Sequence, residues 1–335
     1  MSHVSKESYD PLTDLLGEEL ESVDSLLLAR LRSEVPLVSE IANYLVSSGG
    51  KRFRAMIAIA AARMCGCFEK SHTSLAAAIE LVHAATLLHD DVIDDGQLRR
   101  YKIAAHRIWG NKASILVGDF LLGQAFQIMV EVGSIEALGV VSGAAMNIVE
   151  GEMLQLTGSN KVSLTEPEYM SIIRAKTAAL FSAAGEVGAI IADVSLEKRE
   201  ALKDYGTNLG IAYQLIDDAT DYSSSSCDTE GCTDFSEGKV TFPVILAYDR
   251  GSSEEREFWR RCIQRRDVTP EDREQAIFYL HRSLSLKDTV RRAEEYGVVA
   301  KDALYCFEDG VHKRALHDVV VRSIDSASER LFSIS

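Results

Sequence analysis

The chain has 335 residues, with 51 acidic and 36 basic side chains and a formal net charge of −15. This excess of negative charge argues against nucleic acid or an anionic membrane surface as the main partner. The hydrophobic content of 46% allows a sizeable core, and the length suits one large domain or two ordinary ones. Only five prolines and long stretches rich in Ala, Leu, Ile, Val and Glu predict an all-α protein without strands.

The sequence predicts no signal peptide and no membrane span. The first twenty residues carry several acids and no apolar central region, so no signal peptide is predicted. The two most apolar stretches, 55–67 and 178–194, are interrupted by Arg63 and Glu186, so no transmembrane segment is predicted. The six cysteines lack zinc-like pairing and are expected to be free thiols. A cytoplasmic location is expected.

Apolar spacing predicts the helices in chain order. Residues 1–15 are expected to form a loosely ordered arm that precedes one domain over 16–335. The pattern then predicts helices over 14–32, 36–46, 51–64, 74–93, 112–132, 134–156, 166–188, 196–220 and 242–248. The polar segment 223–238 is predicted to be the longest loop. Charged amphipathic helix returns from residue 251, including 254–266 and 283–305.

Two aspartate clusters end two of these helices. They are Asp90, Asp91 and Asp94, after the apolar run 81–89, and Asp217, Asp218 and Asp221, after the apolar run 209–216. On a helix the first and last Asp of each cluster share one face, one turn apart. Like charges at the end of a buried helix are costly without partners, and Mg²⁺ prefers carboxylate oxygens together with substrate phosphates. The pair predicts a magnesium clamp on a diphosphate; a solvated acidic helix end is the alternative for either cluster alone.

Basic side chains occur at two places that suit a diphosphate. Lys51, Arg52 and Arg54 follow a Gly pair at a predicted helix start, where backbone N–H groups and cations together attract phosphate. Arg99 and Arg100 come shortly after the first aspartate cluster. Solvated basic residues near a turn are the alternative interpretation of each group.

Four further polar side chains are candidates for phosphate contacts. Lys176 and Thr177 open an apolar helix segment, and Gln214 lies one turn before the second cluster. A buried, hydrogen-bonded amide is the alternative for Gln214. His83 lies two turns before the first cluster in an almost apolar run, where it is either a core histidine or a phosphate donor.

Six motifs in one order carry a family resemblance. They are GGKRFR (49–54), LLHDDVIDD (87–95) followed by LRR (98–100), LVGDFL (116–121), EGEMLQ (150–155), KTAALF (176–181), and QLIDDATDY (214–222) followed by EGKVTFP (237–243). Together they resemble the trans-polyprenyl diphosphate synthases, and the long-chain type such as octaprenyl diphosphate synthase most closely. The resemblance runs from about residue 48 to residue 246.

The resemblance implies a fold and a reaction. The fold is an isoprenoid-synthase-like single-domain helical bundle around a deep central cavity, paired as a homodimer. The reaction is the Mg²⁺-dependent head-to-tail condensation of isopentenyl diphosphate onto an allylic diphosphate, giving a long all-trans product of octaprenyl length that serves as a quinone side-chain precursor. Two to three Mg²⁺ ions are implied, which Mn²⁺ can replace, and product release implies transient membrane contact.

The resemblance also implies roles for single residues. The Mg²⁺ ligands are Asp90, Asp91, Asp94, Asp217, Asp218 and Asp221. The residues that contact the allylic diphosphate are Arg99, Lys176, Thr177, Gln214 and Lys239. The residues that contact isopentenyl diphosphate are Lys51, Arg54, His83 and Arg100.

Product length is expected to depend on residues beneath the first cluster. Ala85 and Thr86 lie about one helical turn before Asp90 and are small, whereas short-chain relatives carry aromatic rings there. Their size implies a long product. Phe126 and Met129 are candidates for the floor of the tunnel, and ordinary core packing explains those two residues equally well.

The chain departs from the family pattern in two segments, and two alternative functions stay open. The Gly and Pro that usually follow the paired arginines are replaced by residues of the segment 101–106, and no lysine follows the second cluster before Lys239. A weakly active or regulatory subunit is therefore one alternative, against which both intact clusters argue. The other is a terpene cyclase of similar fold, against which the four cationic positions for isopentenyl diphosphate argue.

Overall fold

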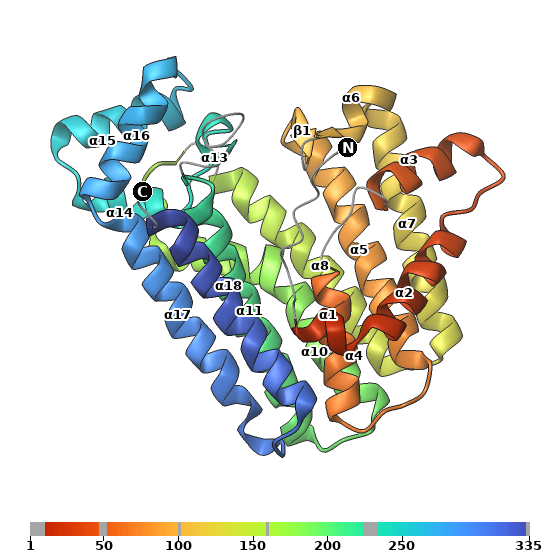
Figure 1. Cartoon of the computed structure of the whole chain (residues 1–335). Coiled ribbons are helices and arrows are strands. Elements are labelled where there is room, and N and C mark those ends of the chain that lie inside the picture. The colour runs from red at the N-terminus through yellow and green to blue at the C-terminus, as the bar shows by residue number, and fades with distance from the viewer. Residues whose placement is uncertain (1–10, 47–51, 100–101, 159–160, 224–232, 333–335) are drawn as a thin grey trace, which may run out of the picture. The chain divides into compact units, whose positions relative to one another are not determined.

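The computed structural model describes residues 11–46, 52–99, 102–158, 161–223 and 233–332 (Figure 1). Within these ranges the secondary structure is helical apart from two strands of two residues each. The prediction of an all-α protein is confirmed, with this hairpin as its one exception in the described chain.

The chain divides into two compact units. Unit 1 comprises Met1–Gly143, Ala183–Lys203 and Tyr305–Val319, and unit 2 comprises Ala144–Ser182, Asp204–Leu304 and Val320–Ser335. The single domain expected over residues 16–335 stays a prediction.

Helix α5 is the centre of unit 1 and packs against α7, α4 and α2. It is apolar almost all round, and such a helix is stable only when other helices cover it. The elements of this part of the chain are α1 (Pro11–Leu15), α2 (Gly17–Arg30), α3 (Pro36–Val46), α4 (Phe53–Met64), α5 (Ser71–Ile93), β1 (Leu98–Arg99), β2 (Lys102–Ile103), α6 (Ala105–Trp109) and α7 (Asn111–Val132).

The described end of the predicted N-terminal arm is ordered. Residues 11–15 form α1, because Leu12 is fully buried, and Leu16 at the junction with α2 is buried as well. The helix predicted over 14–32 is therefore two helices. Residues 1–10 lie outside the described residues.

The remaining elements belong to unit 2 or are divided between the units. They are α8 (Ile135–Gly158), α9 (Glu166–Ile173), the π-helix η1 (Arg174–Ala178), α10 (Ala179–Ile191), α11 (Leu196–Thr220), α13 (Thr233–Ser236), α14 (Phe242–Arg250), α15 (Ser253–Trp259), the π-helix η2 (Arg260–Gln264), α16 (Pro270–Arg282), α17 (Ser285–Ala303), the 3₁₀ turn η3 (Leu304–Cys306) and α18 (Val311–Phe332). Capping boxes begin three of these helices: Thr165 with Glu168 at α9, Ser252 with Glu255 at α15, and Thr269 with Asp272 at α16.

One described helix, α7, has the length and composition of a membrane span. Its most apolar window has a mean hydropathy of 1.5, and 39% of that window is buried within the protein. A core helix can have the same properties, and α7 packs along α5. No transmembrane segment was predicted over these residues, which include Lys112, Asp119 and Glu131.

Candidate active site

The first aspartate cluster lies at the C-terminal end of α5, as predicted. Asp94 is the cap residue, and its N–H donates to the Asp90 carbonyl oxygen at 2.8 Å. The side chains of Asp90 and Asp94 are partly exposed, whereas Asp91 is only 7% exposed. Asp90 and Asp94 thus share the accessible face of the helix end.

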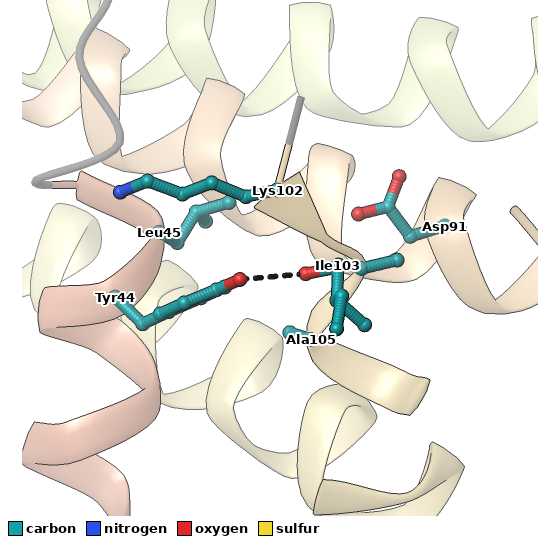
Figure 2. A pocket seen from close by; sticks show the side chains of 7 residues that line it. Tyr44, Leu45, Asp91, Lys102, Ile103 and Ala105 are labelled. Carbon is teal, nitrogen blue, oxygen red and sulfur yellow. Dashed lines mark hydrogen bonds between the residues drawn. The ribbon is translucent and has the colours of Figure 1, made fainter. Parts of the chain in front are cut away.

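Asp91 faces a small pocket at the end of α5 (Figure 2). The pocket is lined by Tyr44, Leu45, Asp91, Lys102, Ile103, Ala104 and Ala105. The Tyr44 hydroxyl donates to the Ile103 carbonyl oxygen at 2.8 Å, and the Lys102 ammonium lies 5.3 Å from the centre of the Tyr44 ring. Asp91 thus lines the same pocket as Lys102 and Ile103 of the hairpin. The role of Asp91 as a Mg²⁺ ligand stays a prediction.

The strands β1 and β2 follow this helix end as an antiparallel hairpin. Leu98 pairs with Ile103 and Arg99 with Lys102, and the Ala104 N–H donates to the Gln97 carbonyl oxygen at 3.0 Å. No strand was predicted here, because two residues are too few for an alternating pattern. Arg99 in β1 follows Asp94 by five residues. The predicted phosphate contacts of the Arg99 side chain, Arg100 and Lys51 lie outside the described residues.

A buried acid, Glu80, ties the start of α4 to α5. Its carboxylate accepts from the Ala55 N–H at 3.1 Å and lies 3.7 Å from the Arg52 guanidinium. The partly exposed Arg54 is in the first turn of α4, and His83 is one turn beyond Glu80 on α5. Glu80 thus joins the elements that carry two predicted isopentenyl diphosphate contacts. Sequence analysis missed it, although a lone acid inside an apolar run was a usable signal.

The four predicted chain-length residues have different surroundings. Ala85 and Met129 are buried in the core, with 0% and 1% of their surfaces exposed. Thr86 is partly exposed, and its hydroxyl donates to the His83 carbonyl oxygen at 2.8 Å. Phe126 is exposed on α7. Thr86 and Phe126 are therefore the two that a molecule outside the core can touch.

The second cluster contains a buried, fully engaged carboxylate. Asp218 is 2% exposed and accepts from the Gln214 amide at 2.8 Å, the Phe242 N–H at 3.3 Å and the Tyr169 hydroxyl. The Gln214 carbonyl oxygen in turn accepts from the Thr177 hydroxyl at 2.8 Å. A hydrogen-bonded chain thus runs from Thr177 to Tyr169 through two predicted site residues. Tyr169 was missed, because nothing near it in sequence marks it.

The other two acids of the second cluster remain accessible. The Asp217 side chain is exposed and Asp221 is partly exposed. Asp221 accepts from the Thr233 N–H at 3.2 Å, the Thr233 hydroxyl at 2.8 Å and the Asp234 N–H at 3.1 Å. Asp221 therefore holds the start of α13, and with it a further acid, Asp234, close to the cluster.

The acids of the second cluster destabilise one another's charged forms. Burial raises the pKa of Asp218 to about 7, although hydrogen bonds from Tyr169 and Gln214 oppose the shift. Loss of surrounding water and the Asp221 charge raise the pKa of Asp217, and the same two causes raise the pKa of Asp234 well above its ordinary value. The Asp217 side chain is exposed on one face, but protein atoms exclude water from the other, so its pKa is still raised. A divalent cation would relieve this repulsion, so the donor set fits Mg²⁺.

Lys239 supplies positive charge to these acids. Its ammonium lowers the pKa of both Asp217 and Asp234 and also pairs with Glu237 at 2.7 Å. Its N–H donates to the Asp234 carbonyl oxygen at 2.8 Å. Lys239 therefore lies close to the second cluster, and its contact with the allylic diphosphate stays a prediction.

Lys176 and Thr177 lie in the π-helix η1, a type of turn that occurs often at functional sites. The Lys176 ammonium pairs with Glu152 of α8 and lies 3.3 Å from the Gln155 side-chain oxygen. A Cβ atom at Gly151 would lie 2.7 Å from the Lys176 backbone nitrogen, so α8 and η1 touch through backbone. Glu152 and Gln155 were missed as contacts, although the motif 150–155 contains both.

The described residues contain no group of three or more His, Cys, Asp or Glu side chains that could hold a metal ion unaided. Mg²⁺ commonly takes only one or two carboxylates and completes its octahedron with water and substrate phosphates. The accessible acids at the end of each of the two helices fit that kind of binding.

The predicted site residues belong to both units. Those described in unit 1 are Asp90, Asp91, Asp94, Arg54, His83, Ala85, Thr86, Phe126 and Met129. Those in unit 2 are Asp217, Asp218, Asp221, Lys176, Thr177, Gln214 and Lys239. In unit 2, Thr177, Gln214 and Lys239 lie close to the acids of the second cluster, whereas Lys176 is paired with Glu152. In unit 1, Asp90, Asp91 and Asp94 lie on one helix end.

Comparison with known proteins gives consistent similarities. Residues 35–280 match the family model for polyprenyl synthetases. The chain is 40% identical to octaprenyl diphosphate synthase from Escherichia coli K12 over 312 residues, which are 92% of this chain and 95% of that protein. It superposes on polyprenyl synthase from Caulobacter crescentus CB15 with a TM-score of 0.91 and 44% identity, covering 95% and 97% of the two chains. It also superposes on a decaprenyl diphosphate synthase from Rhodobacter capsulatus with a TM-score of 0.91 and 39% identity, covering 96% and 99%.

Proposed function

Since this chain belongs to the polyprenyl synthetase family, we propose that it extends an allylic diphosphate with isopentenyl diphosphate to a product of octaprenyl length. The chain is a prenyltransferase that makes long-chain trans-polyprenyl diphosphates. The observation that carries the proposed reaction is the pair of aspartate clusters at the C-terminal ends of α5 and α11, each with accessible acids. The proposed octaprenyl length is supported by the similarity to octaprenyl diphosphate synthase.

The acidic groups are proposed to hold the leaving diphosphate through metal ions. Asp90 and Asp94 at one cluster, and Asp217 and Asp221 at the other, are the accessible ligands; Mg²⁺ bound there supplies positive charge to the departing oxygens. Lys239 adds its ammonium to the second cluster. The Caulobacter crescentus polyprenyl synthase was crystallised with calcium and isoprenyl diphosphate, which supports a divalent cation at such a site.

The carbon–carbon bond forms when the leaving group departs. The allylic C–O bond breaks, and the double bond of isopentenyl diphosphate supplies the electron pair to the allylic carbon. The resulting cation then loses a proton, which the departed diphosphate is placed to accept, so no side chain need act as a strong base. Positive groups aimed at the leaving oxygens stabilise the transition state more than the ground state. Arg54 and His83, with Lys51 and Arg100, are proposed to hold the second diphosphate.

The proposed assembly is a homodimer in the cytoplasm. Large apolar side chains on α7 and α8 are exposed in the described chain, including Leu116, Val130, Met146 and Val149. Exposed apolar surface on helices is typical of faces that a second subunit covers. Brief contact of the protein with a membrane is proposed for release of the apolar product.

One assay tests the proposed function against its alternatives. The purified protein is incubated with farnesyl diphosphate, labelled isopentenyl diphosphate and Mg²⁺, and the dephosphorylated products are sized by chromatography. A labelled C40 product is expected. A hydrocarbon formed without isopentenyl diphosphate would indicate a cyclase, and no turnover by the isolated chain would indicate a partner-dependent subunit.

A further inference from the structure

We propose that Arg107 is a positioning residue for the first aspartate cluster, because its guanidinium holds the turn in which α5 ends. This inference rests on the proposed function only in taking Asp90 and Asp94 as Mg²⁺ ligands. No motif of the sequence includes Arg107, and no substrate contact is assigned to it.

The turn after Asp94 has an unusual backbone. Asp95 adopts φ +54°, in the left-handed region that residues other than Gly rarely occupy, and the Gly96 N–H closes the turn on the Asp91 carbonyl oxygen at 3.1 Å. This is the left-handed conformation that often ends a helix and is usually taken by Gly, so it costs more at Asp95 than it would at a glycine. Contacts to Asp95 and Gly96 from outside the helix add to the hydrogen bond that closes the turn.

Arg107 of α6 supplies those contacts. Its Nη2 atom donates to the Asp95 carbonyl oxygen at 2.9 Å and lies 2.8 Å from the Asp95 carboxylate, and its Nε lies 3.5 Å from the Gly96 carbonyl oxygen. A cation beside the last carbonyls of a helix is favoured by the helix dipole. One guanidinium thus engages two consecutive residues that follow the cluster.

The helix that carries Arg107 is itself fixed. The neighbouring His106 is 5% exposed with its Nε2 atom 3.7 Å from the Asp95 carboxylate, and α6 packs on α7 and α5. On the other side of the hairpin, Tyr44 of α3 holds the Ile103 carbonyl oxygen (Figure 2). The end of α5 is thereby held by a rigid neighbour. A planar, forked guanidinium makes this set of bonds, whereas an ammonium cannot.

Whether cation binding becomes weaker or tighter after replacement of Arg107 distinguishes a positioning role from a purely electrostatic one. Removing a positive charge close to a cation site should tighten cation binding, since like charges repel. Loss of positioning should weaken cation binding, because Asp90 and Asp94 are no longer held in one arrangement. Arg107→Lys keeps the charge and loses the fork, so it should behave like Arg107→Ala if geometry matters.

The test measures cation binding directly. Mn²⁺ binding to the full-length protein in the presence of inorganic diphosphate is followed by electron paramagnetic resonance, for the wild type, Arg107→Ala and Arg107→Lys. Weakening of about tenfold is expected for both variants, the lower end of the range for residues that support metal ligands. In the prenyl transfer assay, both variants should need more Mg²⁺ for half-maximal rate.

Arg256→Ala is the matched control. The Arg256 guanidinium likewise donates to two consecutive carbonyl oxygens, those of Tyr248 at 3.0 Å and Asp249 at 2.7 Å, near the end of α14. Neither of these two residues belongs to an aspartate cluster. Arg256→Ala should leave Mn²⁺ binding unchanged.

Unchanged or tighter Mn²⁺ binding in Arg107→Ala, or wild-type binding in Arg107→Lys, would overturn the proposal. If Arg107→Ala does not fold, the lysine variant alone decides. A wild-type protein that binds Mn²⁺ but does not join isopentenyl diphosphate to a primer would contradict the proposed function and leave the role of Arg107 intact.

Discussion

Tyr169 is a buried hydrogen-bond donor to the second cluster that the sequence did not predict. It is buried, and its hydroxyl donates to Asp218. Burial and the Asp218 charge raise its pKa well above the ordinary value, so it remains a protonated donor at neutral pH. Tyr169 is stacked on Phe242, whose N–H binds the same carboxylate. The Tyr169 hydroxyl and the Phe242 N–H thus hold Oδ2 of Asp218, whereas the Gln214 amide holds Oδ1.

Tyr169→Phe should therefore weaken both stability and catalysis. It removes a donor and leaves a buried carboxylate oxygen short of one partner, which costs about 1 to 3 kcal/mol. Urea unfolding and steady-state kinetics measure the two effects. Tyr305→Phe is the control, since its hydroxyl also binds a carboxylate, Glu197 at 2.9 Å, but the side chain is 73% exposed. Equal losses in the two variants would contradict an orienting role for Tyr169.

The raised pKa of Asp218 predicts a pH dependence of stability. The carboxyl has a pKa of about 7 in the folded protein against 3.8 as its ordinary value. Its stabilising contribution is therefore complete below pH 3.8 and is lost as the pH rises to about 7, because only the unfolded chain ionises readily there. Thermal unfolding of the metal-free protein measures this slope.

Asp218→Asn cannot ionise and should flatten this slope. The melting temperature of the variant, relative to the wild type, should rise between pH 4 and pH 7. If the difference in melting temperature between variant and wild type stays constant across that range, Asp218 is ionised in the folded protein. Its hydrogen-bond donors would then outweigh the effect of burial on its pKa.

At the scale of elements, the contact between α8 and η1 positions Lys176. Gly151→Ala would place a Cβ atom 2.7 Å from the Lys176 backbone nitrogen, and backbone cannot move aside as a flexible side chain can. The expected result is displacement of η1 and a kcat lower by about tenfold or more, since small displacements in an active site are costly.

Gly143→Ala is the matched control on the same helix. A Cβ atom there meets nothing within 4 Å, so Ala should stabilise the helix by about 0.5 to 1 kcal/mol and leave kcat unchanged. Normal kinetics in Gly151→Ala would show that the contact does not position Lys176.

The face of α5 beneath the first cluster makes a second prediction at this scale. Thr86 is partly exposed and Ala85 is fully buried. Thr86→Phe should shorten the product towards farnesyl or geranylgeranyl length with the overall rate largely kept. Ala85→Phe should instead destabilise the protein by about 1 to 3 kcal/mol, the usual cost of overpacking a core. Chromatography of dephosphorylated products and thermal unfolding separate the two. A long-chain product from Thr86→Phe would mean that the chain does not pass this position.

For the whole molecule, the acidic balance predicts dependence of ligand binding on divalent cations. With a net charge of −15 and two aspartate clusters, the protein should bind inorganic diphosphate only when Mg²⁺ is present. Mg²⁺ and diphosphate together should raise the melting temperature, since ligands that bind only the folded state stabilise it. Diphosphate with excess chelator should leave it unchanged. A shift without metal would indicate that Lys and Arg side chains suffice.

Much of the helical architecture is predictable from local pattern. The helices predicted over 36–46 and 196–220 agree with α3 and α11, and both clusters fall at helix ends as expected. Apolar spacing and charge are local properties that one stretch of chain carries by itself. The hairpin β1–β2 was not predictable, since strands of two residues are too short for an alternating pattern. Apolar spacing likewise does not distinguish the π-turn η1 from the rest of the predicted helix 166–188.

The sequence by itself determined the helical class of this protein, its family and the candidate acids and cations of its site, because composition, spacing and motif order are properties of the linear chain. Only the tertiary structure decided which of those acids are accessible. Asp218 is buried because Tyr169, 49 residues away, and the Phe242 backbone meet it. Asp91 is buried and lines a small pocket together with residues of α3 and β2. Burial and hydrogen bonding depend on which helices meet, and a single-sequence pattern does not contain that information.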